Sequence, residues 1–324
     1  MTSEQPSAGE AAIEIRGLSK SFQTGHLLWR HSTPALQDLT LRLETGEILG
    51  YLGPNGAGKT TTLKILTGLL RADEGEAWVL GKPLRDRSWR YRVGYLPEHP
   101  YLYDYLTAQE YLDYIGRLFA MDRKARRERA RELLSLVGLS RHAHTPLRRF
   151  SKGMVQRAGI AQALMNDPAL VILDEPMSGL DPIGRRLVRN LILDLRRAGK
   201  TVLFSTHILS DAETLCDRVA VLKAGRLLDV GPLDRILNLD VSHLEVLLTG
   251  VGSAAPEIKG VRARQALGER WKLEIDESAL GATVSAIERA GGRVLSVQPV
   301  RQSLEDYFFK ELDEREAGKW SEGD

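Results

Sequence analysis

Cysteine is almost absent from this chain of 324 residues, and it has no long apolar run. The single cysteine, Cys216, cannot form an internal disulfide, and no charged-then-apolar leader opens the chain, so we expect a reducing, cytoplasmic location. Apolar runs such as "ALVIL" and "VAVL" are far shorter than the roughly 20 residues that span a bilayer. A role at a membrane would therefore require a separate membrane protein as partner.

Neither sign of charge is in large excess, which removes one general class of partner. The 45 basic and 43 acidic residues leave a formal net charge of +2, so we expect no nucleic-acid partner. The run "RKARRERAR" from Arg123 is locally basic, but on a helix such a run most often forms a solvated face. The sequence also has no internal repeat and no Cys/His spacing typical of a metal site.

The hydrophobic pattern predicts an α/β domain over residues 13–231, after a flexible tail at 1–12. Short apolar runs alternate there with helical stretches. The runs "ILGYLG", "LVILDE" and "TVLFST" do not alternate with polar residues, as expected of strands buried on both faces of a mainly parallel sheet. Between about 98 and 150 the strands stop, which indicates an inserted helical subdomain.

A second unit is predicted over residues 232–314, followed by a flexible tail at 315–324. Its order is strand, strand, helix, strand, helix, which is typical of a small α+β domain. In the first of these helices Leu280 and Ile287 fall on one face, and Gly291 provides a C-terminal stop.

The segment "LGPNGAGKTT" predicts a phosphate-binding loop, because it matches G-x-x-x-x-G-K-[ST] between an apolar strand and a helix. Glycines let successive backbone N–H groups turn toward phosphate oxygens, and the following helix presents its positive end to them. Lys59 would reach the outer phosphates, and the Thr60 hydroxyl would bind Mg²⁺. The loop comprises Gly53, Pro54, Asn55, Gly56, Ala57, Gly58, Lys59, Thr60 and Thr61.

A pair of carboxylates ends the aliphatic run "ALVILDEP". Asp174 and Glu175 at the mouth of a buried strand are costly unless they face a charge or solvent. Beside a bound Mg²⁺, Asp174 would hold the metal through its water shell. Glu175 could then polarise the attacking water as a general base.

A second anion site is predicted in "FSKGMVQR". Ser151 is a good N-cap for the helix "GMVQRAGIAQALM". A helix start offers free N–H groups and a partial positive charge, which together favour a phosphate.

These segments, taken in order with "LDEPMSGLDP" and "FSTHILSDAE", resemble the nucleotide-binding subunit of ABC transporters over residues 13–231. The resemblance implies a P-loop NTPase domain with a mainly parallel sheet core, an antiparallel β edge and an inserted helical subdomain. It also implies ATP as ligand, Mg²⁺ as cofactor, and a homodimer or heterodimer of ATPase subunits that closes head-to-tail over two ATP molecules.

The resemblance assigns residues to both halves of such a site. "FSKGM" corresponds to the family's signature L-S-G-G-Q, with Ser151 and Gly153 matching, and this helix start contacts the γ-phosphate held by the other subunit. Lys152, where the family usually has glycine, could add positive charge there or point to solvent. His207 matches the switch histidine that bonds the γ-phosphate, and Asp181 matches the aspartate that couples the two sites.

Phe22 in "SKSF" is the candidate aromatic platform under adenine, but "QTGHLLWRHSTP" is longer than the usual connection, so Trp29 is a rival. Glu98 stands where the family normally has a glutamine between sheet core and helical subdomain. A carboxylate there could hold Mg²⁺ more strongly.

Seven of the nine tyrosines crowd around Glu98, in a region that receives the membrane subunits in the family: Tyr91, Tyr95, Tyr101, Tyr103, Tyr105, Tyr111 and Tyr114. Tyrosine suits protein interfaces, although about half of these rings could simply pack the helical subdomain.

The function implied is an ATPase on the cytoplasmic face of the cell membrane that powers transport, with a leaning to export, through a separate integral membrane permease. A soluble ATPase scaffold with no membrane partner is the alternative. A small-molecule kinase would leave Ser151, Asp181 and His207 unexplained.

Overall fold

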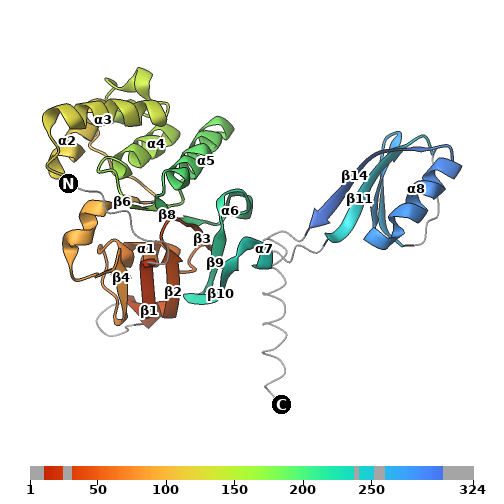
Figure 1. Ribbon diagram of the computed structural model, residues 1–324, viewed down its shortest axis with the longest axis horizontal. Helices are drawn as coiled ribbons and strands as arrows, with labels where there is room; N and C mark the ends of the chain where they lie inside the picture. Colours follow the sequence, from red (N-terminus) through yellow and green to blue (C-terminus); the bar gives the residue numbers. More distant parts are fainter. Residues whose placement is uncertain (1–10, 25–30, 237–240, 252–259, 302–324) are drawn as a thin grey trace, which may run out of the picture. The chain divides into compact units, whose positions relative to one another are not determined.

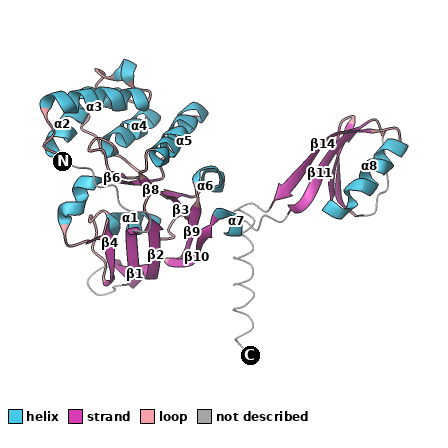
Figure 2. Cartoon of the chain, viewed as in Figure 1, coloured by secondary structure: helices cyan, strands magenta, loops and turns pink. Residues whose placement is uncertain are grey.

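The structure is a computed structural model that describes residues 11–24, 31–236, 241–251 and 260–301 (Figures 1 and 2). The chain divides into two compact units after Leu233. Trp29, most of the two predicted tails and the predicted helix "SLEDYFFKEL" lie outside the described residues.

A six-stranded sheet forms the centre of the first unit, in the order β10-β9-β3-β8-β7-β6. Five strands run parallel, and β10 pairs antiparallel with β9. All residues of β3, β7 and β8 are buried, which confirms the prediction from their unbroken apolar runs. The strands are β3 (Ile48–Leu52), β6 (Val93–Leu96), β7 (Leu170–Asp174), β8 (Thr201–Thr206), β9 (Arg218–Lys223) and β10 (Arg226–Pro232).

An antiparallel sheet covers one face of the central sheet. Its order is β2-β1-β4-β5, and β1 starts two residues before the predicted domain boundary at residue 13. One hydrophobic cluster joins this sheet, helix α1 and the side chains of β3 that point toward them, such as Leu49 and Tyr51. The elements are β1 (Ala11–Thr24), β2 (His31–Glu44), β4 (Glu74–Val79), β5 (Lys82–Pro83) and α1 (Lys59–Leu66).

Helices cover the opposite face of the central sheet (Figure 1). Three of them, α2, α3 and α4, stand between β6 and β7 in the chain. Helices α2 and α3 fall within residues 98–150, where the helical subdomain is predicted, and α4 follows that range. Residues of these helices share a second cluster with Phe204 and with α5. Helix α2 begins with a capping box of Thr107 and Glu110. The helices are α2 (Ala108–Leu118), α3 (Arg123–Leu136), α4 (Lys152–Ala163), α5 (Pro182–Arg197) and α6 (Leu209–Leu215).

Among the described residues, the second unit is an antiparallel sheet in the order β12-β13-β11-β14 with helix α8 packed on it. Three strands precede this helix where the sequence pattern predicted two, because β12 was not predicted. In helix α8 Ile287 is fully buried and Leu280 packs on the same cluster. Gly291 follows the helix with φ 76°, as a C-terminal stop requires. The elements are β11 (Val241–Thr249), β12 (Val261–Leu267), β13 (Arg270–Ile275), α8 (Leu280–Arg289) and β14 (Arg293–Arg301), and the short α7 (Leu233–Ile236) precedes them.

Among the described residues, no helix is both long enough and apolar enough to cross a bilayer.

Candidate functional site

The loop between β3 and α1 has the geometry of an anion cradle. Gly58 caps α1 with φ 103°, and the described residues provide no side-chain cap hydrogen bond at this helix start. Lys59 is buried, and its ammonium group donates to the carbonyl oxygens of Gly53 at 2.6 Å and Pro54 at 3.2 Å. A helix start with free N–H groups and a lysine folded over the loop can bind an anion with several negative oxygens.

At two loop positions, both the backbone conformation and the nearby atoms leave room only for glycine. A Cβ on Gly58 would lie 2.5 Å from the carbonyl oxygen of Ala35 on β2. A Cβ on Gly53 would lie 2.5 Å from the carbonyl oxygen of Leu222 on β9. The loop is therefore pressed against both sheets at its base, whereas Pro54, Asn55 and Gly56 form its exposed rim and Thr60 and Thr61 lie half-buried at the helix start.

Asp174 is a fully buried carboxylate at the carboxyl end of β7. Its Oδ1 accepts a hydrogen bond of 2.6 Å from the Ser205 hydroxyl, whereas its Oδ2 is buried without a hydrogen-bond partner in the described part of the chain. Burial raises the pKa of Asp174, and the charge of Glu98 adds to the rise, while the Ser205 and Thr60 hydroxyls act in the opposite direction. A cation at Oδ2 would offset the cost of burying this charge.

Glu175, the next residue, is held in a left-handed backbone conformation with φ 49°. Its Oε2 lies 2.9 Å from Nδ1 of His207, and its Oε1 lies 3.7 Å from Nζ of Lys59. The Lys59 and Glu175 side chains are both more than nine-tenths buried, whereas the His207 side chain is 47% exposed. The three ionisable groups therefore meet at the ends of β3, β7 and β8, which are neighbours in the sheet.

The oxygens near the cradle suit a hard cation such as Mg²⁺. The unpartnered Oδ2 of Asp174 and the Thr60 hydroxyl are oxygen donors of the kind that Mg²⁺ prefers. Glu98 is exposed, and its charge is close enough to raise the pKa of both Asp174 and Tyr95, after the larger effect of burial. These residues could hold the metal together with phosphate oxygens.

Other predicted site residues stand apart from the cradle. Ser151 is an exposed N-cap of α4, where its hydroxyl accepts from the Met154 N–H at 3.3 Å. Asp181 is an exposed N-cap of α5 and accepts from the Gly184 N–H at 2.7 Å. Within the described ranges, neither residue hydrogen-bonds to the phosphate loop.

The helix start at Ser151 is packed against the loop that follows Glu175. A Cβ on Gly153 would lie 3.4 Å from the carbonyl oxygen of Gly179, so the two backbones approach closely. The aliphatic part of the Lys152 side chain lies along Gly179. A Cβ on Gly179 would lie 2.8 Å from Cδ of Lys152.

The predicted aromatic residues divide between surface and core. Phe22 on β1 is 40% exposed, and Nζ of Lys20 lies 5.8 Å from its ring centroid. Since Trp29 lies outside the described residues, the choice of adenine platform stays a prediction. Among the tyrosines, Tyr101, Tyr103 and Tyr105 are 94%, 59% and 84% exposed, whereas Tyr111 is buried in the helical subdomain.

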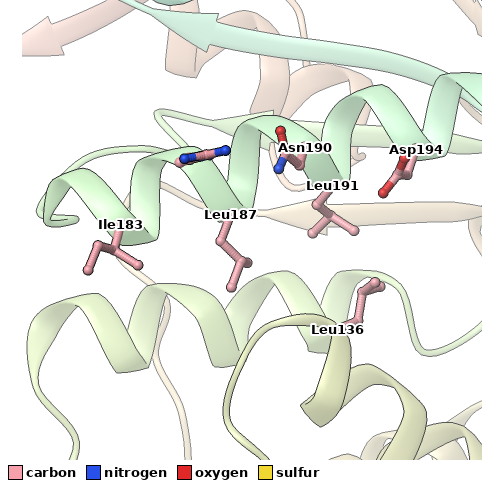
Figure 3. A pocket seen from close by; sticks show the side chains of 7 residues that line it. Leu136, Ile183, Leu187, Asn190, Leu191 and Asp194 are labelled. Atoms are coloured by element: carbon pink, nitrogen blue, oxygen red, sulfur yellow. The ribbon is translucent and has the colours of Figure 1, made fainter.

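A separate groove lies between α5 and the end of α3 (Figure 3). Leu136, Ile183, Leu187 and Leu191 supply its apolar lining. The residues that line it include no member of the predicted nucleotide site.

Sequence reasoning missed two residues that touch Glu175. Ser205 accepts from the Glu175 N–H at 3.0 Å, and the side-chain amide of Gln156 donates to the Glu175 carbonyl oxygen at 3.2 Å. Both side chains are buried polar groups. The available signals were the position of Ser205 two residues before His207, and that of Gln156 inside "FSKGMVQR".

Comparisons with known proteins indicate one family. The sequence model of a family described as ABC transporter matches residues 36–178. An uncharacterized ABC transporter ATP-binding protein of Synechocystis is 44% identical, over 96% of this chain and 88% of its own length. A fluoroquinolones export ATP-binding protein of Mycobacterium tuberculosis is 39% identical, over 68% of this chain and 70% of its own length.

Solved structures share the fold of about two thirds of the chain. One is an ATP-binding cassette that was solved as a dimer in a post-hydrolysis state with ADP and phosphate. It has a TM-score of 0.63 and is 28% identical, covering 68% of this chain and 98% of its own. Another, described as the ATP-binding subunit of an ABC transporter, has a TM-score of 0.61 and is 33% identical, covering 70% of this chain and 92% of its own.

Proposed function

Because the chain belongs to the ABC transporter family and is the ATP-hydrolysing subunit of a transporter, we propose a mechanism of coupling. Two such subunits close over Mg²⁺ and ATP, and this closure drives export through a separate membrane permease. The observation that carries the proposal is the meeting of Lys59, Glu175 and His207 beside the phosphate loop. These three groups can neutralise the phosphates, activate water and orient the reacting atoms.

The chemistry needs no covalent intermediate. Lys59 exchanges its contacts with the loop carbonyls and Glu175 for the outer phosphates of ATP. Glu175 accepts a proton from the water that attacks the γ-phosphorus, and ADP and phosphate are the products. His207 holds the Glu175 carboxylate through the contact of 2.9 Å at its Nδ1, and its other ring nitrogen bonds the γ-phosphate.

Thr60, Asp174 and Glu98 would hold Mg²⁺, which when bound neutralises charge on the phosphate oxygens. The buried, unpartnered Oδ2 of Asp174 supports this assignment.

Ser151, Gly153 and Asp181 serve the nucleotide that is bound to the other subunit, which is a second copy or a related chain. The exposure of Ser151 and Asp181, and the lack of a hydrogen bond from either residue to its own phosphate loop in the described residues, support this division. The similarity to a cassette solved as a dimer with ADP and phosphate also supports it. The adenine ring stacks on Phe22 or Trp29.

The permease binds where Tyr101, Tyr103 and Tyr105 stand exposed between β6 and α2. Large exposed aromatic side chains beside one another favour a protein contact. The subunit would then lie on the cytoplasmic face of the cell membrane. The likeness to a fluoroquinolones export protein supports the export direction.

Mixing two inactive variants tests the shared site. Lys59→Ala destroys the cradle of one chain, and Ser151→Arg blocks the helix start of the other. If sites are shared, an equimolar mixture regains about one quarter of the original ATPase rate, since half of the dimers are mixed and each has one intact site. A mixture as inactive as its components would refute a shared site.

Co-purification tests the permease contact. Replacing Tyr101, Tyr103 and Tyr105 together by Ser should abolish recovery of a membrane protein with this chain from detergent-solubilised membranes. Leu69→Ser, at a side chain 67% exposed outside this tyrosine cluster, is the control. If both variants recovered the same amount of membrane protein, the permease would contact another surface of this chain.

A further inference from the structure

We propose that Gln156 is a positioning residue for hydrolysis, which together with Ser205 clamps the backbone of Glu175 in the conformation that aims its carboxylate at the attacking water. The inference deepens the proposed role of Glu175 and rests on it. It concerns the peptide groups of Glu175, whereas His207 and Lys59 contact its side chain.

The backbone of Glu175 needs such a clamp. Its φ of 49° places an L-residue in the left-handed region, which is unfavourable and persists only where neighbouring contacts enforce it. Six non-glycine residues of the described chain have positive φ, and Glu175 is the buried one among them. Leu80 and Ala224, for comparison, each precede a glycine in a connection between adjacent antiparallel strands.

The two contacts act on opposite sides of the same residue. The N–H of Glu175 donates to the Ser205 hydroxyl at 3.0 Å, and the carbonyl oxygen accepts from Nε2 of Gln156 at 3.2 Å. Rotation about N–Cα or about Cα–C of Glu175 moves its carbonyl oxygen away from Gln156 and breaks their hydrogen bond. The two contacts therefore restrain both φ and ψ of Glu175. Gln156 is only 3% exposed and Ser205 is fully buried, so water cannot easily replace either contact.

The position of Gln156 in the chain gives the clamp a further consequence. Gln156 and Ser151 belong to the same helix end of α4, and Ser151 is the proposed contact to the partner's nucleotide. A helix transmits displacement of one end to nearby turns because its backbone bonds are continuous. A shift of α4 on dimer closure would therefore change the hydrogen bond on Glu175 directly.

A purely structural role for Gln156 makes a different prediction. If Gln156 only satisfies a buried carbonyl group, its loss lowers stability and leaves the turnover of the folded protein unchanged. If it positions Glu175, the rate of the chemical step falls while ATP binding is retained.

The test is Gln156→Met in the full chain, which keeps the side-chain length and removes the N–H donor. We expect kcat for ATP hydrolysis to fall about tenfold or more with KM for ATP changed less than about twofold, because a misplaced reacting group slows chemistry without loosening binding. Gln156→His, whose Nε2–H has a similar reach from the backbone, should recover part of the lost rate. Each rate is measured well below the melting midpoint of the variant.

Gln162→Met is the matched control on the same helix. It removes the hydrogen bond of 2.6 Å that the Tyr111 hydroxyl donates to Gln162, away from Glu175, and should change kcat less than about twofold. An unchanged kcat in Gln156→Met, or an equal loss in Gln162→Met, would overturn the inference.

The Glu175→Gln background separates this inference from the proposed function. There, Gln156→Met should still allow an ATP-dependent dimer, seen by size-exclusion chromatography, because the substitution leaves Ser151 and the phosphate loop unchanged. Loss of that dimer would mean that Gln156 supports α4 instead, and would overturn the inference. If Glu175→Gln by itself forms no ATP-dependent dimer, the proposed closure fails, while the comparison of kcat values still decides the role of Gln156.

Discussion

Replacing Glu175 by Gln should have two opposite effects, tighter ATP binding and slower hydrolysis. The side chain keeps its shape but loses its negative charge. Lys59 is then no longer attracted to the carboxylate that lies 3.7 Å from its ammonium group. ATP phosphates need the same lysine, so they compete with Glu175 in the original protein and meet less competition in the variant.

The size of each effect follows from the site. Two unit charges 3.7 Å apart attract by about 4 kcal/mol at an effective dielectric constant of about 20. Solvation of the released lysine offsets most of this energy, so we expect a net gain of about 1.4 kcal/mol, or about tenfold in ATP affinity. Loss of a general base should slow hydrolysis by about 10²- to 10⁴-fold.

The assay combines titration with a fluorescent ATP analogue and measurement of phosphate release on the same samples. Glu128→Gln, which removes a carboxylate from the exposed side of α3, is the control and should alter neither quantity. Weaker or unchanged ATP affinity in Glu175→Gln would refute the competition between carboxylate and phosphates. Hydrolysis within about threefold of the original rate would refute the role of Glu175 as a base.

Three further predictions concern the loop, the helical subdomain and the metal. Gly58→Ala should destabilise the fold by about 2–4 kcal/mol in urea unfolding, because its Cβ would meet a carbonyl oxygen at 2.5 Å, whereas Gly56→Ala, with nothing within 4 Å, should cost about 1–2 kcal/mol. Burial acts to raise the pKa of Asp113, but hydrogen bonds from Arg126 and Arg117 hold this pKa below its ordinary value. Asp113→Asn should therefore cost about 1–2 kcal/mol at neutral pH, a difference that disappears in unfolding experiments as the pH falls below about 4. Glu98→Gln should raise the Mg²⁺ concentration for half-maximal ATPase by roughly threefold or more, and an unchanged Mg²⁺ dependence would contradict a metal role.

Much of the fold was predictable because the relevant signals are local. Unbroken apolar runs predicted β3, β7 and β8 as strands buried on both faces, and the structure confirms all three. The phosphate-loop pattern predicted a turn between a strand and a helix, and α1 begins at Lys59 as expected. The family and its ATPase activity followed from the order of these short segments, which the comparisons bear out.

Short-range patterns, by themselves, determined which segments become strands, which glycines line a phosphate loop and which residue types could carry the chemistry. Tertiary structure alone decided that Lys59 and Glu175 come within 3.7 Å, and that Gln156 and Ser205 hold the peptide groups of Glu175. The physical reason is the strand order, in which β8 lies between β3 and β7 although it follows both in the chain. Contacts across that order depend on how the whole sheet assembles, and no local spacing of residues encodes them.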